Sequence, residues 1–417
     1  MAAKLLVSQS ETYSIYSSAG TTVTGGKPFF AFADGLNAPV FAELYDSTGK
    51  LVWTFSNNSG TSSPTYLVDT ARHCEGADNG AVDIFVAEAD ANGVTVYGLS
   101  SASTTPTPAW SVPLAGCSID GGGGTYQGLQ ASANGNRVAV QCIHKGTPAP
   151  TARVYLIGGQ SGKITWSYDL GASVKAGQGQ VQITQDGSFV LFVNEGGTPT
   201  PNTATAYIFD GGKGTLRDSI TIPFFITAAI SDTGNYVVVG DEPDVHVWMW
   251  DAGSAKYAKA YDLAPPPAAV GVIPWDVQMS TGADSEELVI VGYISGDVKT
   301  VQVSAWALTN ATLVTNWISK TNTQLQENPT LRADGEYIGV SLWGDSGEKG
   351  YPTVVLLKRG SDVPLFSYVT PGSMFAVDVQ FVTAAGKDTV YLAAAGKHVP
   401  ANAFGNGGDA FAWEITF

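Results

Sequence analysis

This sequence is poor in charge and in cysteine, and it has no long apolar run. Charged residues make up only 14% of the 417 residues, against about a quarter in a typical globular protein. No apolar stretch reaches about 18 residues, so we expect no membrane-spanning helix. There is no basic run, and the formal net charge is -16. This polyanionic character disfavours nucleic acid and anionic lipid as partners.

The chain contains only three cysteines, Cys74, Cys117 and Cys142. None forms a C-x-x-C pair, which leaves zinc and thioredoxin-type chemistry without support. One interpretation is that all three are small buried apolar residues. The alternative is one disulfide, with Cys74–Cys117 across a repeat boundary as the favoured pair and at least one thiol left over. Low charge and many Gly, Ser and Thr residues favour an extracellular or periplasmic location.

A unit of about 50 residues recurs along the chain, and it has the pattern of a strand, a turn and a second strand. Residues 129–138 (LQASANGNRV) share this plan with residues 181–187 (VQITQDG) and with residues 331–335 (LRADG). Asn-Gly and Asp-Gly at the turn are strong hairpin signals, because both positions tolerate a positive φ. A repeat of this period made only of strands predicts an all-β fold, the β-propeller.

Counting the repeats predicts eight blades, each a four-stranded antiparallel sheet, in one domain spanning residues 1–417. The last repeat has only three strands, and the N-terminal segment 4–9 is expected to supply its fourth. The ring would then be closed by pairing the N- and C-terminal strands, which removes exposed sheet edges. Seven blades are the alternative if either end is irregular. The expected blades are 10–57, 66–116, 125–170, 178–222, 225–263, 275–320, 328–370 and 375–417.

A second signature joins the third and fourth strands of some repeats. Residues 46–53 (DSTGKLVW) match residues 159–166 (GQSGKITW), and residues 310–317 are a diverged copy. This pattern resembles the repeat of pyrroloquinoline-quinone-type propellers, and the Asp-Gly turns resemble those of YVTN and WD40 propellers. The resemblance implies that Trp53 and Trp166 dock between neighbouring blades as structural packing residues.

Two enzymatic interpretations find no support in the sequence. Quinoprotein dehydrogenases of this superfamily carry two adjacent cysteines beside the cofactor, and no two cysteines are adjacent here. Fragments around His73 and Ser346 resemble serine-protease motifs. A triad needs its members within hydrogen-bond reach, and these two residues fall in different blades, so we regard both matches as chance.

Ligand candidates come from the first strand of each blade, which lines the central channel of a propeller. Carboxylates and amides that converge there would suit a cation, a sugar or a shifted pKa for proton transfer. The alternative is a hydrated channel rim. The candidates are Asp69, Trp275, Asp276, Glu327, Asn328 and Asp378.

One acidic loop is a candidate for a divalent cation, and we expect no other cofactor. Its donor set combines three carboxylates with an imidazole, which suits metal binding or acid–base chemistry; a solvated loop is the alternative. The candidate ligands are Asp241, Glu242, Asp244 and His246.

The expected function is that of a non-catalytic scaffold that binds a protein or carbohydrate through one face or the central channel. A strong scaffold signature without a convincing catalytic cluster favours this interpretation. The alternative is a hydrolase or lyase that acts on a sugar or small polar substrate in the channel, because propeller sites draw single residues from several blades. Two sequons, at Asn57 and Asn310, would accept glycans in a secretory pathway.

Overall fold

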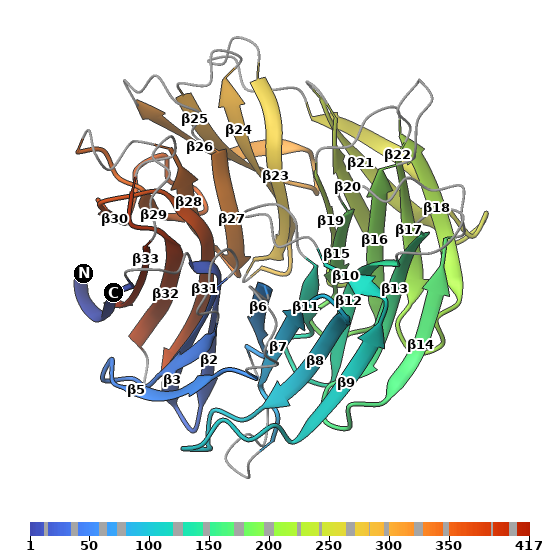
Figure 1. Ribbon diagram of the computed structural model, residues 1–417. Coiled ribbons are helices and arrows are strands. Elements are labelled where there is room, and N and C mark those ends of the chain that lie inside the picture. The colour runs from blue at the N-terminus through green and yellow to red at the C-terminus, as the bar shows by residue number, and fades with distance from the viewer. Residues whose placement is uncertain are drawn as a thin grey trace. The chain divides into compact units, whose positions relative to one another are not determined.

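The structure is a computed structural model in which every described regular element is a β-strand (Figure 1). The described residues are those of 1–417 outside the segments 12–15, 35–40, 58–64, 73–80, 120–127, 145–150, 171–178, 196–203, 223–226, 242–243, 264–271, 283, 296–299, 321–327, 345–349, 385–386 and 400–406. His73, Cys74 and Ser346, which were discussed from the sequence, lie outside the described residues.

The chain divides into two compact units. One comprises Met1–Ala19, Ile226–Trp250 and Ala258–Phe417, and the other comprises Gly20–Phe225 and Asp251–Tyr257. We call the eight sheets blades 1 to 8 in the order of their first strands, except that the N-terminal strand belongs to blade 8.

Blades 1 to 4 belong mainly to the second unit. Blade 1 contains β2(Tyr16–Thr24), β3(Lys27–Asp34), β4(Ala42–Tyr45) and β5(Leu51–Phe55), and blade 2 contains β6(Thr65–Thr70), β7(Ile84–Ala89), β8(Gly93–Leu99) and β9(Trp110–Ala115). Blade 3 contains β10(Cys117–Ser118), β11(Leu129–Ala131), β12(Arg137–His144), β13(Thr151–Gly158) and β14(Ile164–Asp169). Blade 4 contains β15(Gly179–Ile183), β16(Phe189–Glu195), β17(Ala204–Asp210) and β18(Leu216–Ile222).

Blades 5 to 8 belong mainly to the first unit. Blade 5 contains β19(Thr227–Ile230), β20(Tyr236–Gly240), β21(Val245–Asp251) and β22(Lys256–Leu263), and blade 6 contains β23(Val272–Thr281), β24(Glu287–Ser295), β25(Thr300–Ala307) and β26(Thr312–Lys320). Blade 7 contains β27(Asn328–Asp334), β28(Tyr337–Trp343), β29(Val354–Lys358) and β30(Phe366–Tyr368). Blade 8 contains β31(Met374–Ala384), β32(Lys387–Lys397), β33(Gly408–Thr416) and β1(Ala2–Glu11).

This set of sheets makes the chain an eight-bladed β-propeller, as predicted. Seven blades have four strands, and in blade 3 the innermost position is shared by two short strands, β10 and β11, which both pair with β12. The pairings between neighbouring strands are antiparallel. Eight blades rather than seven are present because the N-terminal segment is ordered as a strand and completes the last repeat.

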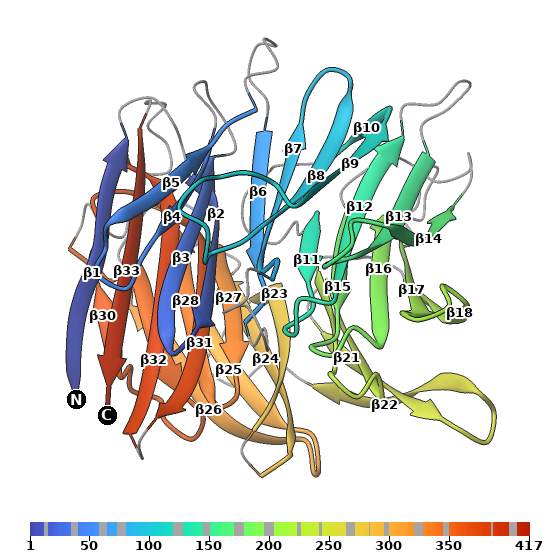
Figure 2. The same cartoon turned by 90° about the horizontal axis from the view of Figure 1, so that it is seen from below.

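The predicted pairing of the two chain ends is confirmed. Strand β1 runs antiparallel to β33, from Ala2 opposite Thr416 to Glu11 opposite Gly408, with one bulge between Leu5 and Val7. The two strands lie side by side in both views (Figures 1 and 2). Strand β1 is therefore the outermost strand of blade 8.

The hydrophobic core lies between neighbouring sheets. One cluster joins Leu331 and Val340 of blade 7 to Val303 of blade 6, and another joins Val354 of blade 7 to Phe411 of blade 8. Alternate residues of each strand point to opposite faces. Because an inner strand packs against a neighbouring sheet on each face, both of its faces are apolar. The long Val- and Ile-rich runs of the second strands have this origin.

The turns of the sequence repeat have the predicted backbone conformation. Gly135, Gly187, Gly234 and Gly335 end equivalent turns, and their φ angles are 67, 74, 64 and 58°. Only glycine adopts this left-handed region without steric cost. The repeated Asn-Gly and Asp-Gly pairs therefore reflect one backbone turn made again in each blade.

The two tryptophans predicted to be structural have that role. The indole of Trp166 donates a hydrogen bond to Gly211 O of the next blade at 3.0 Å. Trp53 is 4% exposed and packs with Val68 and Val86 of blade 2. Sequence comparison missed a third member, Trp110, which donates to Gly159 O at 2.8 Å. These side chains fix one blade against the next.

The favoured disulfide, Cys74–Cys117, is wrong. Cys117 of β10 is bonded to Cys142 of β12, with their Cα atoms 5.3 Å apart. Sequence analysis placed Cys117 in a connection between blades. In the structure, residues 117–118 pair with the end of β12, which brings the two cysteines onto neighbouring strands at a suitable separation for a disulfide.

Candidate functional site

Two of the predicted channel carboxylates bind the backbone of the next blade. Asp69 of β6 is 8% exposed and accepts a hydrogen bond from Ala131 N at 2.7 Å. Asp276 of β23 is fully buried and accepts one from Leu331 N at 2.8 Å. The innermost strand of a blade has one edge without a strand neighbour, and these carboxylates satisfy amides on that edge. Both side chains therefore join blades.

Burial raises the pKa of Asp276 to about 7, although its hydrogen bond from Leu331 and the nearby Arg332 act in the opposite direction. A value near neutrality would suit a general acid or base. The residue has no exposed surface, so a substrate has no access to this carboxyl group. The raised pKa here reflects the desolvation of a structural carboxyl group.

The other channel candidates differ from one another in their surroundings. Trp275 is half-buried at a bulge in β23. Asn328 begins β27, is 1% exposed, and neither polar atom of its amide has a hydrogen-bond partner among the described residues. Asp378 of β31 is 2% exposed and has an interaction partner. Glu327 lies outside the described residues.

The acidic loop of blade 5 surrounds His246 with carboxylates. Asp241 Oδ1 lies 3.1 Å from Nε2 of His246, and Asp262 Oδ1 lies 2.5 Å from Nδ1. Lys259 binds the same oxygen of Asp262 at 2.6 Å. Two ionised carboxylates can both accept from one imidazole only when both of its nitrogens carry protons. Each nitrogen of His246 therefore faces one carboxyl group, and the ring is held between Asp241 and Asp262.

The predicted cation site at this loop is left as a prediction. Within the part of the chain that the structure describes, no group of three or more His, Cys, Asp or Glu side chains is arranged to hold a metal ion. Both nitrogens of His246 already face carboxylates, and Glu242 lies outside the described residues. Asp262, which sequence analysis did not select, is the partner that the fold brings to His246 from 16 residues away.

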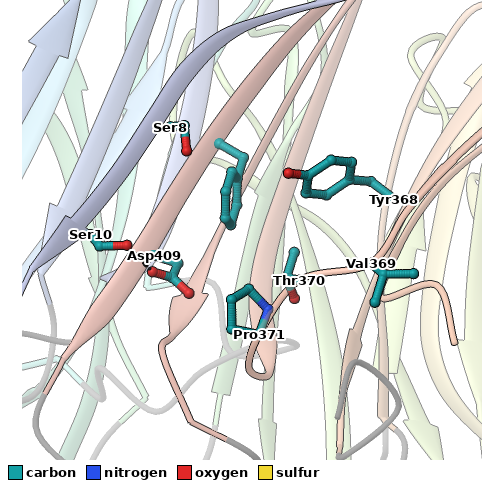
Figure 3. Close-up of a pocket in the computed structure, with 8 residues that line it drawn as sticks. Ser8, Ser10, Tyr368, Val369, Thr370, Pro371 and Asp409 are labelled. Atoms are coloured by element: carbon teal, nitrogen blue, oxygen red, sulfur yellow. Dashed lines mark hydrogen bonds between the residues drawn. The ribbon is translucent and has the colours of Figure 1, made fainter. Parts of the chain in front are cut away.

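A pocket of about 380 Å³ lies between blades 7 and 8 (Figure 3). Its lining residues are Ser8, Ser10, Tyr368, Val369, Thr370, Pro371, Asp409 and Phe411. The phenol group of Tyr368 points across the pocket toward the side occupied by Ser8 and Ser10. The volume falls within the usual range for ligand sites, and a mixture of aromatic rings with a few polar groups is typical of them.

Strand register explains how these residues meet. Ser8 pairs with Phe411 and Ser10 pairs with Asp409, so the four side chains project from the same face of blade 8. Tyr368 projects from the last strand of blade 7, and its ring lies 5.5 Å from that of Phe411. Behind it, Thr370 is fixed by a 2.7 Å hydrogen bond with Thr353. The pocket is therefore built on regular strands.

A buried carboxylate lies at the base of this pocket. The Asp409 side chain has no exposed surface, whereas the side chain of His398 is 50% exposed. Asp409 Oδ1 accepts a hydrogen bond from Ser10 Oγ at 2.5 Å and lies 2.9 Å from Nδ1 of His398. Ser10 and His398 both bind Asp409, so this is not a serine-protease relay, in which the serine would bind the histidine.

Sequence analysis missed this site because its residues come from both ends of the chain. Ser10 and Asp409 are 399 positions apart, and His398 has no partner that is recognisable by spacing. The predicted pairing of the terminal strands nevertheless implied that residues of the two chain ends would lie side by side. With the register known, alternate residues of β1 fall beside alternate residues of β33.

Comparisons with known proteins support the fold alone. No protein-family model matches the sequence, and no curated protein matches it. Among solved structures, the Dos1 propeller is similar, with a TM-score of 0.57 and 11% identity over 98% of this chain and 95% of that chain. Sqt1 of Chaetomium thermophilum, solved bound to the N-terminus of ribosomal protein L10, has a TM-score of 0.56 and 11% identity over 99% of both chains. The chain is thus similar to other β-propellers in fold.

None of the described segments contains a helix that is long and apolar enough to cross a bilayer.

Proposed function

We propose that this chain is a binding protein, a propeller scaffold that holds an extended segment of a partner protein at the pocket between blades 7 and 8. The observation that carries the proposal is the position of this pocket beside the outermost strand of blade 8. Ser8 and Ser10 of β1 form one wall of the pocket, and the opposite edge of β1 is paired with no described strand.

Strand β1 suits the addition of a further strand. It has ten residues, and its exposed residues are Ala2, Ala3, Lys4, Leu5, Ser8 and Ser10. An edge strand offers unpaired N–H and C=O groups to an incoming extended segment. A residue of that segment placed opposite Ser8 or Ser10 projects on their face of the sheet. Its side chain would then enter the pocket toward Tyr368.

The chemistry of the other candidate groups also favours binding over catalysis. Asp276 is buried and bonded to the backbone, His246 lies between two carboxylates, and Asp409 is bonded to Ser10 and His398. Each of these groups is engaged within the fold, and none of them stands beside a nucleophile in the arrangement that covalent catalysis requires. Binding of a protein segment by Sqt1, a propeller of similar fold, supports the same class of function.

We further propose that the protein works outside the cytoplasm. The Cys117–Cys142 disulfide supports this location, because disulfides persist in oxidising compartments and are rare in the cytosol. Thiol titration of the unreduced, denatured protein is the first test. It should find one thiol per chain, and three after reduction, since the chain has 3 cysteines of which the disulfide occupies two. Three thiols before reduction would contradict the location.

The binding function is tested by selecting partners for the pocket. A library of random segments of about twelve residues, displayed on phage, is selected against the full chain, and bound segments are re-measured on variants. Ser8→Trp fills the pocket from an exposed position, and Tyr368→Ala removes its opposite wall. We expect selected segments to bind the wild type and to lose at least about ten-fold in affinity on either variant, which corresponds to about 1.4 kcal/mol.

A matched control distinguishes the effect of filling the pocket from the effect of placing a tryptophan on the protein surface. Ser111 is an exposed serine on β9, the outermost strand of blade 2, and Ser111→Trp should leave affinity unchanged. Segments that bind all variants equally, or that are lost only with Ser111→Trp, would place binding elsewhere and overturn the proposal.

A further inference from the structure

We infer that the pocket takes a lysine side chain of the partner segment, and that His398 competes with this ammonium group for the charge of Asp409. The inference rests on the proposed function and names the residue that the pocket recognises. Three features carry it: a buried carboxylate, hydroxyl groups at its wall, and two aromatic rings.

The first feature is the incomplete neutralisation of Asp409. Its only ion pair within the described segments is with His398, and imidazole is the side-chain group whose charge ordinarily changes between about pH 5 and 8. When His398 is neutral, the pocket contains a negative charge that is shielded from water. The whole chain has a formal net charge of -16, which adds to the attraction of a cationic group.

The second feature is the set of hydroxyl acceptors. Ser10 donates its proton to Asp409, so its oxygen retains lone pairs toward the pocket and is made a better acceptor by the bond that it donates. Ser8 and Tyr368 also line the pocket with hydroxyl groups. A lysine ammonium has three N–H donors that can point in separate directions. It can therefore reach these oxygens without touching the buried carboxylate itself.

The third feature is aromatic. Tyr368 and Phe411 both line the pocket, with ring centroids 5.5 Å apart. The aliphatic stem of a lysine packs well on such rings, and its ammonium group is attracted to their faces. A guanidinium group is a poorer match, because its planar fork requires an accessible carboxylate for bidentate pairing, and Asp409 has no exposed surface.

His398 makes this recognition dependent on pH. Its Nδ1 lies 2.9 and 3.0 Å from the two oxygens of Asp409. When His398 is protonated, its imidazolium neutralises Asp409 and the pocket loses its attraction for a second cation. Other titratable groups at this end of the strands include Lys397, which pairs with Gly408 and whose pKa is lowered by burial, and Glu11, which also pairs with Gly408. Tyr368 faces the pocket from blade 7.

The test compares peptides that differ only in the side chain at the pocket position. A segment selected in the library screen is synthesised with lysine, Nε-acetyl-lysine, norleucine or arginine at its pocket position. Affinities for the full chain are then measured by calorimetry at about pH 7.5 and about pH 5.5, on either side of the histidine titration. We expect the lysine peptide to bind at least about ten-fold more tightly than the acetylated and norleucine peptides at the higher pH. We expect most of this advantage to vanish at the lower pH.

Two variants identify the groups responsible. Ser10→Ala should abolish the preference for lysine over norleucine, and His398→Gln should abolish its pH dependence while the preference itself remains. Ser111→Ala is the control for loss of a surface hydroxyl group, and melting curves confirm that each variant is folded. Equal binding of the lysine and norleucine peptides would overturn this inference and leave the proposed function intact. Failure of every selected segment to depend on Ser8 or Tyr368 would overturn both.

Discussion

At the scale of single residues, the turn between the third and fourth strands of several blades contains a position that requires a positive φ. Gly49, Gly162 and Gly214 occupy it in three blades with φ between 65 and 81°. In blades 5 and 6 the position is filled by alanine, at Ala255 and Ala311, with φ of 53 and 51°. An L-residue in this region is strained by about 1–2 kcal/mol through contact of its Cβ atom with the backbone.

Replacing Ala311 by glycine should therefore stabilise the protein. We expect a gain of about 0.5–1 kcal/mol in the free energy of unfolding, because relief of strain exceeds the extra chain entropy of glycine. Urea denaturation measures it. The reverse change at the equivalent site, Gly162→Ala, should be destabilising, since a Cβ atom there would lie 2.7 Å from Trp110 Cγ. A loss of stability for Ala311→Gly would contradict this account of the turn.

At the scale of the element, side chains of the inner strands hold neighbouring blades together. The carboxylates of Asp69 and Asp276 accept hydrogen bonds from Ala131 N and Leu331 N of the next blade. In the same way, Gln130 Oε1 accepts a hydrogen bond from Ile183 N at 2.6 Å, and Thr227 Oγ1 accepts one from Val277 N at 3.0 Å. Different residue types thus perform the same task. Two of the candidate channel residues, Asp69 and Asp276, therefore bind the backbone of the next blade, although their carboxylates would also suit a ligand site.

Asp276 gives this role a measurable pH dependence. Its folded-state pKa of about 7 lies above the ordinary value of 3.8, so the folded state favours the protonated form. The stabilisation that the protonated Asp276 gives the folded state is fully present below the unfolded-state pKa of 3.8, and it is lost as the pH rises toward about 7.

The isosteric variant Asp276→Asn retains a carbonyl acceptor for Leu331 N and removes the titration. It should gain stability relative to the wild type as pH increases from about 4 to about 8, by about 2–4 kcal/mol in total. Guanidinium denaturation of both proteins at several pH values measures this difference. A difference that does not change with pH would mean that the carboxyl group titrates normally in the folded state.

At the scale of the whole molecule, the N-terminal strand completes the last blade. Val7 of β1 is 1% exposed, whereas Leu5 of the same strand is 42% exposed. Removing buried methyl groups loses transfer free energy and leaves a cavity. We expect Val7→Ala to cost about 1–2 kcal/mol of unfolding free energy and Leu5→Ala to cost less than about 0.5 kcal/mol. Equal effects in thermal and urea unfolding would argue against the docking of β1 on blade 8.

The sequence was sufficient for the fold and insufficient for the site, and the physical reason is the range of the interactions. Turn glycines such as Gly135 and interblade tryptophans such as Trp166 repeat at a fixed period, so that local patterns count the blades. The Cys117–Cys142 disulfide and the His246–Asp262 contact depend on the register of particular strands. The pocket depends on a pairing between the two ends of the chain, and only the register of β1 against β33 reveals which serines and which carboxylate meet.

The most direct test of the central claim, that a partner segment binds between blades 7 and 8 along β1, is hydrogen–deuterium exchange of the full chain with and without a selected segment. The account predicts slower exchange confined to residues 2–11 and to the segment from Tyr368 to Pro371, with no change in β9 of blade 2. Protection that appears on other blades while β1 exchanges unchanged would contradict it.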